Sequence, residues 1–169
     1  DEQAAEAVEE VLLLLQLVAV RVQDPHREQG REAVQRVELR RLDVVDRLAD
    51  AIASVDGVFL LDRTSDASHN RSVFTLAGEA DDVTEALERL VAAAIHDIDM
   101  DVHTGEHPRI GAVDVIPFVP LADTTMDDCV ALAQAFGERL ASRFDLPVYL
   151  YAQAAARPER VKLSDVRRG

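Results

Sequence analysis

The stretch that decides the fold is residues 58–94, which read VFLLDRTSDASHNRSVFTLAGEADDVTEALERLVAAA. It begins with a short apolar run, residues 58–61, and is polar over residues 62–70. A second run typical of a strand, residues 72–76, ends near Gly78. The short polar connection predicts that these two strands pair as a hairpin. After the acidic turn Asp81-Asp82, apolar residues recur at helical spacing, which predicts a helix directly behind the hairpin.

The segments on either side extend this pattern. Residues 42–55 have the apolar spacing of a helix, and Gly57 follows as its C-cap. Residues 113–119 predict a strand with Pro117 at an edge or a bulge, and Thr124 or Thr125 can cap a further helix. The buried stripe of that helix is expected at Met126, Val130, Ala133, Gly137, Leu140 and Phe144. Residues 147–151 predict a last strand, so the order favours an α+β fold with a mostly antiparallel sheet and helices on one face.

The beginning of the chain differs from the rest. Residues 3–22 are expected to form a helix with a wide apolar face, which Asp24-Pro25 and Gly30 then break. We therefore interpret residues 1–36 as an N-terminal helical extension of unclear origin, and residues 37–169 as the main domain.

Composition limits the classes of function. The net charge of −14 argues against a nucleic-acid surface, because phosphate contacts need clustered basic residues. Cys129 is the single cysteine, which excludes a disulfide framework and a thiolate metal site and fits a reducing compartment. We expect it to be a core thiol. The apolar run over residues 11–20 is shorter than the roughly 20 residues of a membrane span, and its flank is acidic. The expectation is a soluble, cytoplasmic protein that contacts no membrane.

The segment richest in chemistry is residues 103–112, which read HTGEHPRIGA on an expected loop before a strand. The imidazole of His107 titrates near neutral pH and can both take and return a proton, and Pro108 favours an extended backbone beneath it. From the residues alone, a surface or structural histidine is the favoured interpretation. The segment also fits the H-x-x-E-H zinc-peptidase pattern, but Gly105 and Pro108 disfavour the helix that this pattern needs.

Asn70 and Arg71 form a second cluster, at the start of the strand over residues 72–76. The planar guanidinium of Arg71 suits a carboxylate ligand. A surface ion pair with one of the many acidic residues is the alternative.

Three blocks together resemble the N-terminal subdomain of the glutamate formimidoyltransferases, which is also found in formimidoyltransferase-cyclodeaminases. These blocks are NRSVFT over residues 70–75, GEHPRIGAVDVIPFVP over residues 105–120, and LPVYLY over residues 146–151. The resemblance covers residues 40–169, so residues 37–169 are expected to be this subdomain. It implies a ferredoxin-like α/β sandwich, which agrees with the order of elements above.

The resemblance also implies a reaction. A formimidoyl group would pass from N-formimidoyl-L-glutamate to the 5-nitrogen of tetrahydrofolate, the co-substrate, in histidine degradation and one-carbon metabolism. The catalytic histidine of the family falls on His107, and no metal is implied. Because both substrates carry carboxylates, Arg71 and Arg109 are candidates to bind them, with Asn70 as a hydrogen-bonding neighbour. Whether the donor is a formimidoyl or a formyl compound stays open, as does the oligomeric state, a homodimer included.

Two departures from the family pattern bear on activity. Residues 37–41 read VELRR where the family carries an N-x-S-E-G motif after its first strand. By the family pattern, we expect the second, C-terminal subdomain, which closes the other wall of the cleft, to be missing from this chain. A half cleft positions two substrates poorly, so we expect weak transfer by this chain alone. A non-catalytic folate-binding or assembly module of the same fold is the alternative function.

Overall fold

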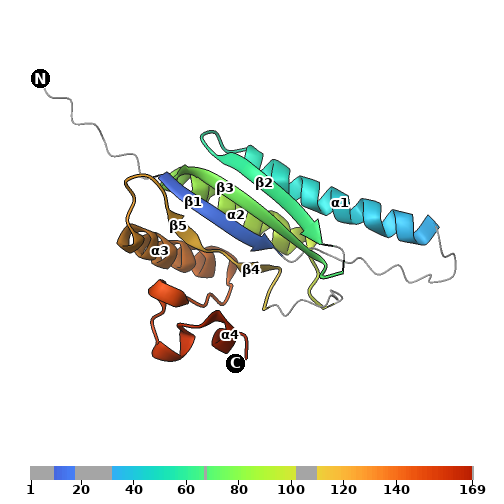
Figure 1. Ribbon diagram of the computed structural model, residues 1–169. Coiled ribbons are helices and arrows are strands. Elements are labelled where there is room, and N and C mark those ends of the chain that lie inside the picture. Colours follow the sequence, from blue (N-terminus) through green and yellow to red (C-terminus); the bar gives the residue numbers. More distant parts are fainter. Residues whose placement is uncertain (1–9, 18–31, 67, 102–109, 169) are drawn as a thin grey trace, which may run out of the picture.

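The computed structural model describes residues 10–17, 32–66, 68–101 and 110–168 (Figure 1). Its strands are β1 (Glu10–Leu17), β2 (Phe59–Asp66), β3 (Arg71–Glu79), β4 (Val113–Val115) and β5 (Phe118–Pro120). Its helices are α1 (Glu32–Ala53), α2 (Ala80–Asp97), α3 (Met126–Phe144) and α4 (Leu163–Val166), with single 3-10 turns η1 (Ala152–Ala154) and η2 (Pro158–Arg160) before α4.

The described strands form one sheet in the order β2-β3-β1-β4, and β5 pairs with β1 beside β4. Every pairing is antiparallel. β1 therefore lies inside the sheet, with β3 on one side and β4 and β5 on the other. Helices α1 and α2 lie side by side over one face, and α3 lies beside β5 (Figure 1). The prediction of mixed helix and strand around an antiparallel sheet is confirmed.

The hairpin that was predicted from residues 58–76 is the β2–β3 pair. β2 is longer than predicted, because its pairing continues through residues expected to be a loop, up to Asp66 opposite Arg71. The register shifts between Leu60 and Asp62, so Leu61 has no partner residue in β3. β2 pairs with no other described strand and is an edge of the sheet.

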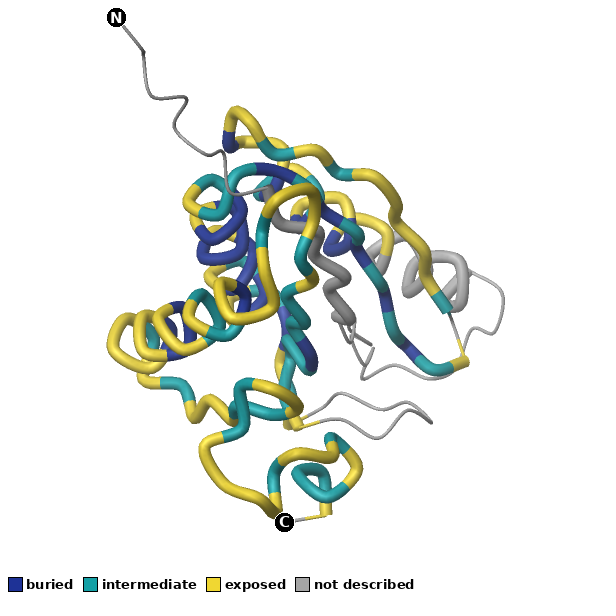
Figure 2. The backbone as a smooth tube through the Cα atoms, turned by 60° about the vertical axis from the view of Figure 1, so that its left-hand side comes forward, coloured by how far each residue is buried: buried dark blue, intermediate teal, exposed yellow. Residues whose placement is uncertain are grey.

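One hydrophobic core joins the helices to the sheet. Along β3 the residues alternate between buried and half-buried, as a strand with one covered face requires. The largest fully buried side chains are Phe74, Leu48, Ile52, Leu76, Leu87, Leu90 and Val83, from α1, β3 and α2. Phe136 and Leu140 of α3 belong to the same cluster. After residue 140 no described residue is buried, although Phe144 and Leu146 pack against the core, and the chain toward the C-terminus forms the lower part of the molecule (Figure 2).

The helix expected over residues 3–22 is wrong at residues 10–17, which form β1. This stretch reads EVLLLLQL and lacks the alternation of a strand with one exposed face. A short apolar run suits a strand inside a sheet as well as a buried helix, and periodicity does not separate the two. The prediction of an N-terminal helical extension is therefore wrong for residues 10–17.

Residues 37–41, which stand where the family carries its N-x-S-E-G motif, lie within α1. α1 begins at Glu32, ten residues before the helix predicted from residue 42. The division of the chain into residues 1–36 and 37–169 stays a prediction.

The strand predicted over residues 113–119 is two short strands, β4 and β5, that flank Ile116 and Pro117. Proline has no N–H to donate to a neighbouring strand, which accounts for the break. Thr125 caps α3 as predicted, in a capping box with Asp128. Met126, expected in the buried stripe of α3, is 44% exposed, whereas Cys129 and Phe136 are buried there.

The last predicted strand, residues 147–151, is absent from the described sheet. Its apolar side chains turn toward α3 instead. At Gly137 of α3, an added Cβ atom would lie 3.2 Å from Cγ1 of Val148 and 3.6 Å from Cδ2 of Leu150. The apolar run that predicted a strand is thus accounted for by contact with a helix.

Candidate functional site

The turn between β2 and β3 carries two residues of the predicted site. Asn70 is 4% exposed and has a left-handed backbone with φ of 49°. Asparagine tolerates this conformation better than most residues, which explains its use at a tight turn. Arg71 follows as the first residue of β3 and is half-buried. The structure therefore holds Asn70 and Arg71 next to each other at one end of the sheet.

The same turn is built on Asp66, which sequence reasoning overlooked. One oxygen of its carboxylate accepts hydrogen bonds from the backbone N–H of Ser68 at 2.9 Å and of His69 at 3.1 Å. The other oxygen lies 2.9 Å from Nδ1 of His69. The hydrogen bonds from the His69 backbone and from Ser68 hold the pKa of Asp66 far below its usual range. The carboxylate of Asp66 thus stabilises the turn that carries Asn70 and Arg71.

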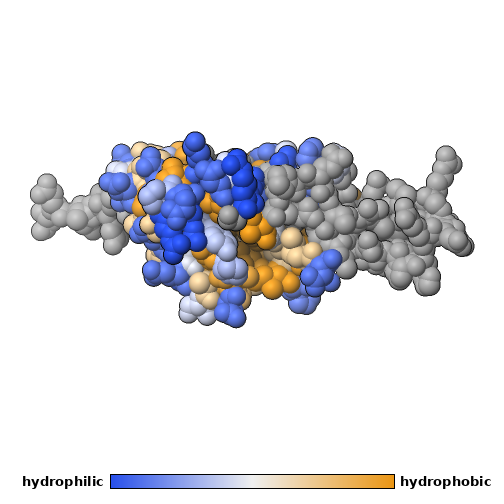
Figure 3. All heavy atoms as spheres, turned by 90° about the horizontal axis from the view of Figure 1, so that it is seen from below, coloured by the Kyte–Doolittle hydropathy of each residue, from blue (hydrophilic) through white to orange (hydrophobic). Residues whose placement is uncertain are grey.

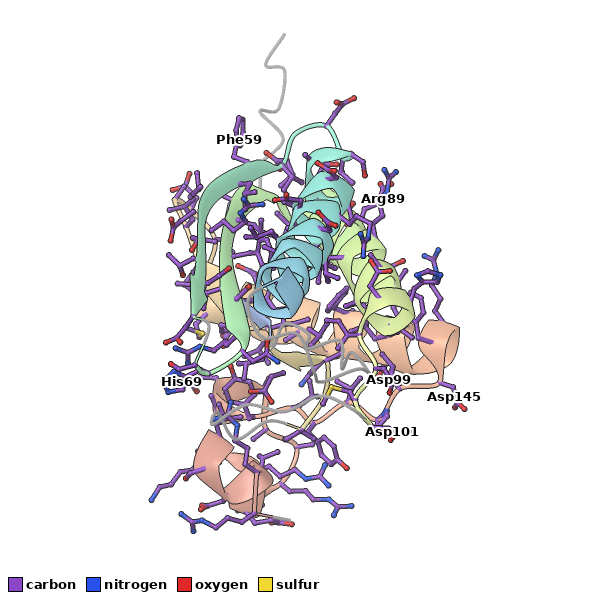
Figure 4. All side chains as sticks on the ribbon, turned by 90° about the vertical axis from the view of Figure 1, so that its right-hand side faces the viewer. Phe59, His69, Arg89, Asp99, Asp101 and Asp145 are labelled. Carbon is purple, nitrogen blue, oxygen red and sulfur yellow. The ribbon has the colours of Figure 1, made fainter. Side chains whose placement is uncertain are left out.

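The second predicted cluster lies outside the described residues. His107 and Arg109, as well as His103, fall within residues 102–109. The chain is described up to Asp101 and again from Ile110. Figure 4 shows His69 of the β2–β3 turn at the left and Asp99 and Asp101 across from it, toward the right, at a similar height.

Asp114, shortly after residues 102–109 in the sequence, forms a buried ionic cluster with Arg167. The Asp114 side chain is wholly buried and forms an ion pair with Nη2 of Arg167, whose side chain is 19% exposed. The second Asp114 oxygen accepts a hydrogen bond from the backbone N–H of Ile110 at 2.9 Å. Tyr151 lies near both charges, and burial raises the pKa of its phenol.

Sequence reasoning missed this cluster, although one signal for it was present. Asp114 is the one acidic residue in the otherwise apolar segment 113–117. Aspartate is almost never fully buried unless it is paired, so an acidic residue in such a run indicates a basic partner elsewhere. The partner is 53 residues away, and no local spacing identifies it.

An open cleft of about 850 Å³ lies between the end of α2, β4 and β5, α3 and residues 146–154. Its walls are mostly apolar, and Asp97, Asp99, Asp101 and Asp114 lie among the lining residues. Seen from below, hydrophobic residues gather in the middle of the described surface between hydrophilic ones (Figure 3). Within the described ranges, no group of three or more His, Cys, Asp or Glu side chains is placed to hold a metal ion.

Cys129 lines this cleft from α3 and is 3% exposed. Burial, and then the charge of Asp128, raise the pKa of its thiol. A buried thiol that stays protonated is a poor nucleophile. The prediction of a core thiol is confirmed.

No helix among the described residues has the length and apolar character that crossing a bilayer requires.

Comparison with known proteins gives consistent matches. The family model described as "Formiminotransferase domain, N-terminal subdomain" matches residues 33–169. Glutamate formimidoyltransferase of Thermoplasma acidophilum is 52% identical over 130 residues, which is 77% of this chain and 43% of that protein. Glutamate formimidoyltransferase of Streptococcus pyogenes is 49% identical over 126 residues, or 75% of this chain and 42% of that protein.

The same region occurs in larger proteins. Formimidoyltransferase-cyclodeaminase of Sus scrofa is 46% identical over 132 residues, which is 78% of this chain and 24% of that protein. The chain thus spans less than half the length of each of these relatives.

Proposed function

Because the chain belongs to the family of formiminotransferase N-terminal subdomains, we propose that it serves the transfer of a formimidoyl group from N-formimidoyl-L-glutamate to the 5-nitrogen of tetrahydrofolate. The names of its relatives in Thermoplasma acidophilum and Streptococcus pyogenes support this reaction. None of the relatives named above is a peptidase, so nothing here supports the zinc-peptidase alternative. The cytoplasmic location and the homodimer stay predictions.

The proposal includes the finer fold class, a ferredoxin-like sandwich. The described elements up to β4 follow the order β-α-β-β-α-β, which is that of the ferredoxin-like motif. The sheet order β2-β3-β1-β4 places the first strand inside, beside the third and fourth.

His107 is the proposed proton carrier of this reaction. Attack of the folate nitrogen on the amidine carbon forms a C–N bond and gives a tetrahedral intermediate. The attacking nitrogen then loses a proton, and the nitrogen of the departing glutamate gains one as its C–N bond breaks. One imidazole between the two nitrogens can do both, because it takes and returns a proton near neutral pH.

Arg71 and Arg109 are the proposed ligands of the substrate carboxylates, with Asn70 beside them. A guanidinium can bind a carboxylate through two parallel hydrogen bonds. The observation that carries the proposal is the family match over residues 33–169. Asn70 lies in the β2–β3 turn and Arg71 is the first residue of β3.

The test is a direct assay of formimidoyl transfer by this chain and by His107→Ala. We expect weak turnover for the chain alone, and a further loss of about 10²- to 10⁴-fold in the variant, the usual effect of removing a general acid-base group. His96→Ala is the matched control, because its side chain is 86% exposed at the end of α2. Robust turnover by the chain alone would disprove the expected weakness, and equal turnover in all three proteins would disprove the role of His107.

Titration with 5-formyltetrahydrofolate separates the alternative function from this one. Binding of this folate without transfer, and without a difference between the chain and His107→Ala in any transfer assay, favours a non-catalytic folate-binding module. The fact that this chain spans only 43% of its Thermoplasma acidophilum relative keeps that alternative open.

A further inference from the structure

Residues 147–168, here called the C-terminal segment, follow α3 and contain η1, η2 and α4. They lie below α3 and β4 in Figure 1, and no described residue among them is buried. The backbone hydrogen bonds of the described segment join its own residues. The N–H of Ala152 donates to the carbonyl oxygen of Val161 at 3.1 Å, and the N–H of Asp165 donates to that of Lys162 at 2.9 Å. The segment is therefore held together by local contacts.

An ion pair joins this segment to the sheet. The carboxylate of Asp114 in β4 is wholly buried and pairs with Arg167, whose side chain is 19% exposed. Nε of Arg167 is buried without a hydrogen-bond partner among the described residues, so the contact with Asp114 holds the guanidinium in place. The neighbouring Arg168 is 76% exposed and forms a surface ion pair with Asp165 at 3.2 Å. A buried carboxylate that loses its cation is strongly disfavoured, so the pair with Arg167 favours this position of the segment.

The C-terminal segment also forms one wall of the apolar cleft. Val148 and Leu150 lie close to Gly137 of α3, and Leu163 and Val166 line the cleft as well. The other walls come from the end of α2, from β4 and β5, and from α3. In its present position the segment keeps water from part of these apolar walls.

The stretch between α3 and η1 has one firm end and one strained end. Leu146 packs against the hydrophobic core. Ala152, the first residue of η1, has a left-handed backbone with φ of 52°. Alanine adopts this conformation only at a cost, because its Cβ atom comes close to the following carbonyl oxygen. The closed position of the segment carries this cost, and the contacts with Asp114 and α3 offset it.

We propose that the C-terminal segment is a hinged cover of the cleft: the pair of Asp114 with Arg167 keeps it closed, and it opens after Leu146 while the sheet and α1–α3 stay folded. Opening returns both charges to water, so neither is left buried alone. It also exposes the apolar walls of the cleft to solvent. The ion pair thus controls access to the cleft, and the proposal does not rest on the proposed function.

The test uses the protease Lys-C, which cuts after lysine. Lys162 is the only lysine of the chain and lies exposed directly before α4. Arg167→Met removes the charge and keeps a long apolar side chain, and Arg168→Met makes the same exchange at the exposed neighbour. We expect cleavage after Lys162 to be about tenfold faster or more in Arg167→Met, because a charged hydrogen bond is lost and cleavage follows the open population. Arg168→Met should be cut at the rate of the parent chain.

Two further measurements show what opens. In Arg167→Met the amides of Val161 and Val166 should exchange with solvent faster than in the parent chain, whereas those of Leu87 and Leu90 in α2 keep the parent rate. The neutral dye Nile red, which fluoresces in apolar surroundings, should bind more to the same variant because the cleft walls become accessible.

Equal cleavage of Arg167→Met and the parent chain would overturn the proposal. Faster exchange at Leu87 and Leu90 in step with Val166 would overturn it too, since the segment and the core would then unfold together, and failure of Arg167→Met to fold would have the same meaning. Faster cleavage without a rise in Nile red fluorescence would show that the segment opens without uncovering the cleft, which contradicts its role as a cover.

Discussion

Gly57 and Gly78 meet where the connection from α1 passes the end of β3. A Cβ atom at Gly78 would lie 2.6 Å from the carbonyl oxygen of Gly57, which is closer than real Cβ atoms come to other heavy atoms. Gly57 itself has φ of +83°, a conformation that other residues adopt only with strain. These two positions allow α1 to turn closely into β2, so the geometry of the hairpin depends on them.

Gly78→Ala should therefore destabilise the protein by about 1–3 kcal/mol, the usual effect of overpacking a close contact. The matched control is Gly111→Ala, since a Cβ there would meet its nearest atom, the carbonyl oxygen of Val113, at 3.5 Å. Urea unfolding followed by circular dichroism measures both variants. Equal unfolding midpoints for the two would show that the backbone at Gly78 yields without strain.

At the scale of elements, the capping box of α3 shows how a short sequence signal sets a boundary. The Thr125 side chain accepts from the backbone N–H of Asp128 at 3.2 Å, and the Asp128 carboxylate accepts from the N–H of Thr125 at 2.8 Å. The hydrogen bonds from Thr125 hold the pKa of Asp128 below its usual value. This end of the helix was predictable because the residues that make it are adjacent in the chain.

Thr125→Ala should lower the free energy of unfolding by about 1 kcal/mol, as is typical for loss of an N-cap side chain. Ser142→Ala provides the control, because Ser142 is exposed in the last turns of the same helix. Both are compared by denaturant titration at neutral pH. A loss of stability in Ser142→Ala as large as that in Thr125→Ala would contradict the assignment of the cap.

Prediction from sequence worked best where neighbouring residues decide the structure. The hairpin, α2 and the cap of α3 follow from spacing and turn residues, and Asn70 and Arg71 were correctly placed at the start of β3. Prediction failed where contacts between residues distant in the sequence decide the structure. β1 is a strand because it pairs with β3, β4 and β5, and residues 147–151 are irregular because they contact α3. The ion pair between Asp114 and Arg167 was missed for the same reason, since no residue close to either one in the sequence indicates its partner.

For the molecule as a whole, the net charge of −14 makes the few pairings between helices important. Nε of Arg47 in α1 donates to the Asp97 carboxylate at the end of α2 at 2.7 Å. Burial alone would raise the pKa of Asp97, but hydrogen bonds from Arg47 and His96 outweigh it and hold the pKa below its usual value. The ion pair thus joins the two helices that cover the sheet.

This pair makes stability depend on pH. A carboxyl group with a lowered pKa in the folded state contributes stability that is present above its unfolded pKa, near 4, and is lost as the pH falls through the folded value. Arg47→Met should therefore be less stable than the parent chain by about 1 kcal/mol at pH 7. Unfolding titrations between pH 7 and pH 2 should show this difference shrinking below roughly pH 4. A difference independent of pH would mean that Arg47 acts through packing instead of charge.

The edge strand β2 bears on how the protein behaves at high concentration. A bare sheet edge with apolar side chains invites other copies to add strands, and Phe59 and Leu61 are 65% and 58% exposed there. The extra residue at Leu61 interrupts the regular ladder, and Asp62 and Arg63 follow it at once. A strand of another copy that approached β2 in register could not align its hydrogen-bonding groups with those of β2. It would also meet the charges of Asp62 and Arg63. We expect this irregularity to hinder growth into fibrils, and deletion of one residue that straightens β2 to favour such growth.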